Sequence, residues 1–80
     1  MSLLAYPCDW LYKIIGVDQP GIEAAVRGAI QGRAHVLTPS HRSRSNRYVS
    51  FNLELVVTDQ ADRDRIFIAL KNHPAVKMVL

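Results

Sequence analysis

Apolar residues alternate with other residues in several stretches of the chain, which is the spacing of β-strands. The clearest stretch is 48–57, and residues 10–16 and 75–80 show the same pattern. A weaker strand is predicted at 35–43, where Pro39 lacks a ladder donor and therefore favours a sheet edge. The strand at 48–57 would turn one face to the core, made of Val49, Phe51, Leu53, Leu55 and Val57.

Helical spacing of apolar residues lies between these strands. The first helix would enter through Asp18 and Pro20 and present one apolar face, made of Ile22, Ala25, Val26, Ala29 and Ile30. The second is predicted at 60–72, where Thr58 or Asp59 would cap it. The order βαββαβ predicts a ferredoxin-like α+β fold, in which two helices cover one face of a four-stranded antiparallel sheet. The first and third strands would be central.

The length of 80 residues predicts one domain over residues 1–80. Apolar residues make up 49% and charged residues 21% of the chain, which is typical of a globular domain. The sequence contains no apolar run of membrane-spanning length, so we expect a cytoplasmic protein without membrane contact. The single cysteine, Cys8, excludes an internal disulfide and paired-thiol metal sites.

Four separated blocks of the sequence resemble the YbeD-like family of small bacterial proteins. They are Tyr6-Pro7-Cys8, Lys13-Ile14-Ile15-Gly16, Ser45-Asn46-Arg47-Tyr48-Val49-Ser50 and His73-Pro74-Ala75-Val76-Lys77-Met78-Val79-Leu80. The resemblance covers nearly the whole chain and implies an ACT-like ferredoxin fold. The family carries no established reaction, so the resemblance implies a fold rather than a chemistry.

A shorter segment is similar to the Asp-x-Pro-Gly-aliphatic turn of ACT domains, which are regulatory modules for amino acids. The segment is Asp18-Gln19-Pro20-Gly21-Ile22. The similarity implies that this turn lies at a dimer interface and binds an amino acid or other small carboxylate through Asp18, Pro20, Gly21 and Ile22. A glycine lets a ligand approach the backbone, and a helix N-terminus presents N–H groups to a carboxylate. The alternative, which we favour, is that Pro20 and Gly21 only start a helix.

The sheet face away from the helices is a candidate docking surface. If Tyr12, Ile14, Val76 and Met78 belong to the core, the other face carries Leu11, Lys13, Ile15, Lys77 and Val79, with Glu54 among them. Aliphatic side chains between charges suit a second copy of the chain or another protein partner. The alternative is a few isolated exposed apolar residues, which every protein has.

The net charge of +3 comes from a basic stretch at 41–48. Arg42, Arg44 and Arg47 could contact phosphates, and Tyr48 could stack on a base. This arrangement makes a nucleic-acid-binding module the second hypothesis. The alternative for the same residues is a solvated hairpin tip that prevents edge pairing.

Catalytic and metal-binding patterns are missing from the sequence. There is no phosphate-binding glycine loop, nucleophile elbow or closely spaced histidine pair. Cys8 could act as a nucleophile only beside a base or a cation, and a structural thiol is the simpler interpretation. We therefore expect a non-catalytic regulatory or adaptor module with no cofactor and no metal.

Overall fold

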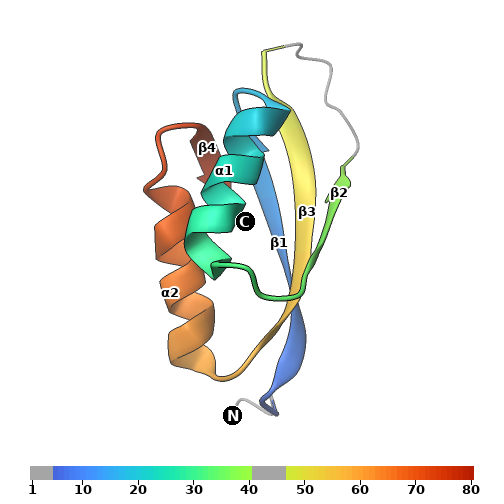
Figure 1. The fold of residues 1–80 in the computed structure, drawn as a ribbon, viewed down its shortest axis with the longest axis vertical. Helices are drawn as coiled ribbons and strands as arrows, with labels where there is room; N and C mark the ends of the chain where they lie inside the picture. Colours follow the sequence, from blue (N-terminus) through green and yellow to red (C-terminus); the bar gives the residue numbers. More distant parts are fainter. Residues whose placement is uncertain (1–4, 41–46) are drawn as a thin grey trace.

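The computed structural model describes residues 5–40 and 47–80 of the chain. Its elements follow in the order β1 (Cys8–Gly16), α1 (Gln19–Ile30), β2 (Val36–Pro39), β3 (Val49–Val57), α2 (Gln60–Lys71) and β4 (Val76–Val79). Figure 1 shows the two helices on one face of the sheet. The predicted βαββαβ ferredoxin-like fold is confirmed.

The four strands lie in the order β2-β3-β1-β4 and all neighbours are antiparallel. β1 and β3 are therefore the central strands, as right-handed crossovers require. They pair without a break from Cys8 opposite Val57 to Gly16 opposite Val49. β2 is an edge strand that includes Pro39, which confirms its predicted position, but it is shorter than the predicted 35–43. Residues 41–43 of that prediction lie outside the described residues.

The core lies between the helices and the facing side of the sheet. Its largest fully buried side chains come from both central strands and both helices: Tyr12, Ile14, Ile22, Ile30, Leu53, Ile66, Leu70, Val26 and Val57. The predicted alternation of buried and outward-facing residues along β3 is confirmed. Its buried side chains are Phe51, Leu53, Leu55 and Val57, and Val49 is half-buried. Each strand of this pair therefore has one side committed to the core.

The first helix begins at an Asx cap. The Asp18 carboxylate accepts a hydrogen bond of 2.7 Å from the Gly21 N–H, and Pro20 lies in the first turn, where its missing N–H has no cost. The helix ends at Gln31, whose left-handed backbone (φ 54°) lets its N–H bond to the Arg27 carbonyl. The helix therefore begins where Asp18 and Pro20 predict it, three residues before its first core residue, Ile22.

The second helix is held by few apolar contacts. Asp59 caps it by accepting from the Asp62 N–H at 2.7 Å, which settles the choice between Thr58 and Asp59. Ile66 and Leu70 are buried and Phe67 is half-buried. Polar contacts therefore contribute to the docking of this helix.

An ion-pair cluster joins the segment after α1 to the start of α2. The Arg33 guanidinium donates two hydrogen bonds of 2.9 Å to the Asp62 carboxylate and one of 2.7 Å to the Val56 carbonyl. Asp62 also accepts from the Thr58 N–H at 3.0 Å and from the Arg65 guanidinium. Bidentate pairing satisfies a carboxylate that is only 6% exposed. This cluster fixes the path of the chain into β2.

The strand β4 breaks the predicted alternation. Its register against β1 shifts by one residue between Ile15 and Gly16, which is a β-bulge. Val76 and Val79 are both buried although they are three positions apart, and Met78 is 50% exposed. The prediction that Val79 lies on the open face and Met78 in the core is therefore wrong, because alternation assumes an uninterrupted ladder.

Candidate functional site

We name the sheet side that faces away from the helices the open face. Six of the eight large hydrophobic side chains that are exposed in the described residues lie on it: Leu11 (53% exposed), Val36 (53%), Tyr48 (38%), Val56 (48%), Met78 (50%) and Leu80 (67%). The strand registers place them there: Val36 is opposite Glu54, which is opposite Leu11 on β1. Leu80 exchanges two backbone hydrogen bonds with Lys13, at 3.1 and 2.8 Å, and extends the face beyond β4. The open face is therefore continuous over all four strands.

Charged residues of opposite sign occupy opposite ends of the open face. Asp9 and Glu54 lie toward the end where β1 begins and β3 ends. Lys77 lies at the other end, where its ammonium is 5.9 Å from the Tyr48 ring centroid, and Lys13 lies on β1 two positions from Leu11 toward that end. The open face therefore has an acidic end and a basic end.

The structure brings most of the predicted interface residues together. Leu11, Lys13 and Ile15 share the open face, with the last two half-buried, and Lys77 is exposed beside them. Val79 does not join them, because the bulge in β4 turns it into the core. Met78 and Val36, which sequence reasoning did not select, take part instead.

The turn proposed to hold a ligand is closed by its own residues. The Asp18 carboxylate accepts from the Gly21 N–H, and the Asp18 carbonyl accepts from the Ile22 N–H at 3.1 Å. A carboxylate ligand would have to displace that of Asp18 at the helix N-terminus. The Pro20 ring adds no N–H donor.

Tight packing explains the glycine in this turn. A Cβ at Gly21 would lie 2.6 Å from the Ala75 Cβ and 2.8 Å from the Asp18 Oδ1, so a larger residue does not fit. The interpretation of Pro20 and Gly21 as a helix start is thus supported by the geometry. Ligand binding at Asp18, Pro20, Gly21 and Ile22 stays a prediction.

The basic stretch is described only in part. Arg42 and Arg44 lie outside the described residues, whereas Arg47 and Tyr48 are exposed just before β3. Phosphate contacts by these residues stay a prediction. Asp9 and Glu54 on the adjoining open face would repel a nucleic-acid backbone.

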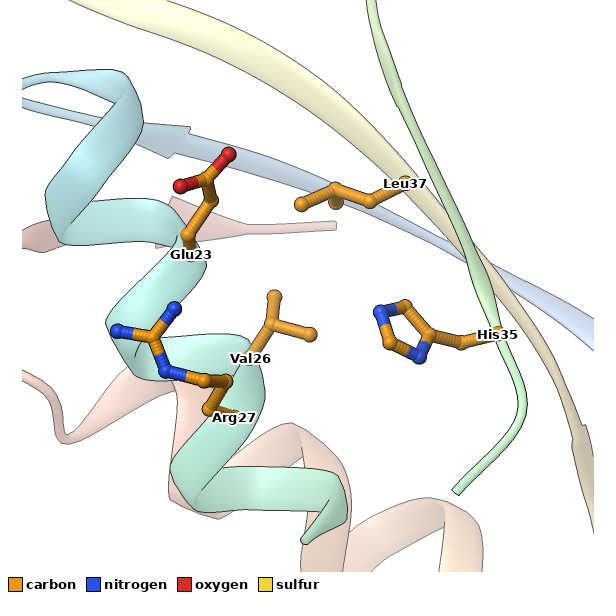
Figure 2. Close-up of a pocket in the computed structure, with 5 residues that line it drawn as sticks. All are labelled: Glu23, Val26, Arg27, His35 and Leu37. Carbon is orange, nitrogen blue, oxygen red and sulfur yellow. The ribbon is translucent and has the colours of Figure 1, made fainter. Parts of the chain in front are cut away.

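A pocket of about 370 Å³, which no sequence pattern indicates, lies between α1 and the entry to β2. Figure 2 shows Glu23, Val26 and Arg27 on the helix side and His35 and Leu37 on the strand side. The helix residues share one face because they are three and four positions apart, and the other two share one side of an extended segment. The spacing of Glu23 and Arg27 is visible in the sequence, but the opposite wall comes only from the fold.

The polar groups of this pocket are oriented by nearby contacts. The Nδ1 of His35 lies 2.8 Å from the Arg33 carbonyl oxygen, which only accepts, so Nδ1 carries the proton of this bond. Figure 2 shows the imidazole directed across the pocket toward α1. Glu23 accepts a bond of 3.0 Å from the Gln19 amide.

Two buried groups have shifted pKa values, and both belong to the structural contacts of α2. The hydrogen bonds from Arg33, followed by the bond from the Thr58 N–H, hold the pKa of Asp62 well below its ordinary value. Burial, with a smaller contribution from the Asp62 charge, raises the pKa of Tyr12 to about 12. The Tyr12 hydroxyl donates a bond of 2.6 Å to the Arg63 carbonyl. The lowered pKa keeps Asp62 charged beside Arg33 at neutral pH, and the raised pKa keeps the Tyr12 hydroxyl protonated as a hydrogen-bond donor.

The remaining chemical candidates have structural contacts. Cys8 is half-buried against the core, and the His73 Nδ1 accepts from the Ala75 N–H at 3.1 Å in the turn before β4. Within residues 5–40 and 47–80, no three His, Cys, Asp or Glu side chains gather as metal ligands do. In the same part of the chain, no helix has the length and apolar run that crossing a membrane would need.

The sequence comparisons reach across the whole chain. The family described as "Protein of unknown function (DUF493)" matches residues 1–80. The UPF0250 protein of Nitrosomonas europaea is 31% identical over 83 residues, which covers 99% of this chain and 95% of the relative. A UPF0250 protein of Neisseria meningitidis serogroup C is 32% identical over 84 residues, which covers 99% of this chain and 91% of the relative.

Solved structures share the fold. A solution structure of protein HP0495 from Helicobacter pylori superposes with a TM-score of 0.82 at 23% identity and covers 100% of this chain and 88% of that one. The ACT domain from the GTP pyrophosphokinase of Chlorobium tepidum superposes with a TM-score of 0.61 at 20% identity and covers 91% of this chain and 97% of that one. At these identities the likeness establishes the fold alone.

Proposed function

As this chain belongs to the DUF493 family and has an ACT-like ferredoxin fold, we propose that it is a non-catalytic regulatory module that pairs with a second copy of itself through the open face. The family match confirms the resemblance to YbeD-like proteins that the sequence indicates. The dimer interface in this proposal is the sheet surface that the two helices leave uncovered.

The gathering of exposed apolar residues on one face carries this proposal. Six of the eight exposed large hydrophobics of the described residues are on the open face, whereas Val17 and Ile68 are scattered elsewhere. Single exposed apolar residues are ordinary on proteins, but a contiguous group that spans a sheet marks an interaction surface. Burial of such a group removes apolar area from water and favours association.

Charge complementarity favours a second copy as the occupant. A two-fold interface pairs each patch with the same patch of the other copy, so the surface has to complement itself. Turning one copy end for end places the acidic end, Asp9 and Glu54, against the basic end with Lys13 and Lys77. Like charges would meet in the opposite orientation, so the pattern also fixes the direction of pairing.

A binding role agrees with the contacts of the ionisable groups. Asp62 is held by Arg33 and Arg65, and the Tyr12 hydroxyl is bonded to a backbone carbonyl. These buried groups hold the helices on the sheet and do not project into a cleft. Regulation through the open face needs no covalent step, because a change in pairing is itself the output.

Sedimentation velocity over a range of protein concentrations tests the proposal. We expect wild type to dimerise as concentration rises and Leu11→Asp to remain monomeric, because symmetry would bury two unpaired carboxylates. Ile68→Asp is the matched control: Ile68 is 54% exposed on α2 and Leu11 is 53% exposed on the open face. A wild type that is monomeric throughout, or equal loss of dimer in both variants, would refute the proposal. Thermal melts establish that the variants are folded.

A further inference from the structure

We propose that the pocket between α1 and β2 binds a small carboxylic acid that also carries a hydrogen-bond donor, such as a short hydroxy or amino acid. The pocket volume of about 370 Å³ is within the usual range of small-molecule sites. Two apolar side chains, Val26 and Leu37, and three polar ones, Glu23, Arg27 and His35, line the pocket. The ligand chemistry follows from what each of those side chains offers.

Arg27 supplies the recognition of the carboxylate. It is exposed, and its guanidinium has no hydrogen-bond or ion-pair partner among the described residues. Arg33, by comparison, is fully engaged with Asp62 and the Val56 carbonyl. A guanidinium presents a planar fork that matches a carboxylate in two parallel hydrogen bonds. The Arg27 fork is therefore available to an acid that enters the pocket.

Glu23 and His35 favour a ligand that also carries a hydrogen-bond donor. The Glu23 carboxylate only accepts hydrogen bonds, and one of its oxygens already accepts from the Gln19 amide. With Nδ1 of His35 bonded to the Arg33 carbonyl, Nε2 is the nitrogen left for a ligand, and in the neutral ring it accepts. A simple carboxylate would meet these acceptors unfavourably, whereas a hydroxyl or ammonium group would satisfy one of them.

The apolar part of the lining, Val26 and Leu37, limits the size of the ligand. Val26 is 1% exposed and Leu37 is half-buried, so Leu37 offers more of the accessible apolar surface in the pocket. Both side chains pack on the core and are held in place by it. A short aliphatic group resting on them would displace water without disturbing the fold. The predicted ligand thus has an acid group, a donor and a few carbons.

This pocket suits a carboxylate better than the turn at the start of the same helix does. At the turn, the Asp18 carboxylate already accepts from the Gly21 N–H, and Ala75 fills the space beside that glycine. In the pocket, Arg27 lies next to Val26 on α1, and His35 and Leu37 lie across from them (Figure 2). The two locations are on opposite sides of α1's first turns and are separable by mutation.

Two-dimensional ¹H–¹⁵N NMR titrations of the full chain test the inference. The probes are 2-hydroxybutyrate and 2-aminobutyrate, with butyrate and butylamine as partial ligands of the same length. We expect saturable shifts of the Val26, Arg27 and His35 amides with at least one of the first two probes, and weaker binding of both partial ligands. Which of the first two binds more tightly identifies the donor as hydroxyl or ammonium.

Variants establish the site. Arg27→Gln should raise the Kd about ten- to a hundredfold because it removes charge-assisted hydrogen bonds. Lys71→Gln, which removes one exposed cation from the last turn of α2, should leave the Kd unchanged. Leu11→Asp should also bind as wild type does, since the open face is on the other side of the sheet. The absence of saturable shifts with both acids, or an unchanged Kd in Arg27→Gln, would overturn the inference.

Discussion

The two faces of the sheet differ in burial and in the kinds of residue they carry. On the covered face, Leu53 and Ile14 are fully buried and belong to a core cluster that includes residues of both helices. On the open face, apolar and charged residues alternate between neighbours, as Leu11 and Glu54 do when they pair across β1 and β3. The same strands therefore carry a surface that determines the fold and a surface that the fold does not need. The excess apolar area of the second surface is what requires a functional explanation.

The largest predicted contrast comes from truncating one leucine on each face. Leu53→Ala should lower the free energy of unfolding by about 2–5 kcal/mol, because it leaves a cavity in a fully buried layer. Leu11→Ala should change the stability of the isolated chain by less than about 0.5 kcal/mol, since Leu11 is 53% exposed. Urea unfolding at concentrations below dimerisation measures both values. Equal losses would mean that the open face belongs to the core.

The next prediction concerns a polar contact, the Arg33–Asp62 ion pair, and how its contribution to stability depends on pH. Asp62→Asn should destabilise the protein by about 1.5–3 kcal/mol at neutral pH, because the bidentate Arg33 pair loses its charge. The pKa of Asp62 is lowered in the fold, so its stabilising effect is complete above the ordinary carboxyl pKa and is lost as pH falls below about 4. The difference between wild type and Asp62→Asn should therefore shrink on acidification. A difference that stays constant down to low pH would contradict this role.

A smaller contrast uses two glycines of the same helix. Gly21→Ala should destabilise by about 1–3 kcal/mol, because its Cβ would lie 2.6 Å from that of Ala75. Gly28→Ala should stabilise by about 0.5–1 kcal/mol, since its Cβ would meet nothing within 4 Å and alanine favours the helix. Thermal unfolding of both variants provides the measurement. If Gly21→Ala were neutral, the close approach of α1 to Ala75 would not be a constraint on the fold.

Local patterns predicted most of the covered face. Alternation along β3 and the three-to-four spacing of Ile22, Val26 and Ile30 located core residues correctly, because an unbroken strand or helix has a fixed period. The acceptor side chain of Asp18 and the early Pro20 likewise predicted the helix start. The fold was predictable because these local signals agree with one another.

Two features were not predictable from local patterns. The bulge in β4 depends on how that strand meets β1, and the residues around Lys77 include no glycine that would mark it. The pocket of Arg27 and His35 joins a helix to the segment that follows it, and Arg33 fixes the path of that segment through a contact with Asp62. Both features arise from contacts between elements that are distant in sequence.

Charge reversal at the two ends of the open face provides the sharpest test of end-for-end dimerisation. One variant, Lys13→Glu/Lys77→Glu, makes the face acidic throughout, and a second, Asp9→Lys/Glu54→Lys, makes it basic throughout. Sedimentation equilibrium should show that each variant alone dimerises more weakly than wild type and that an equimolar mixture forms a heterodimer. If two folded variants pair no better together than alone, end-for-end pairing of the open face is contradicted.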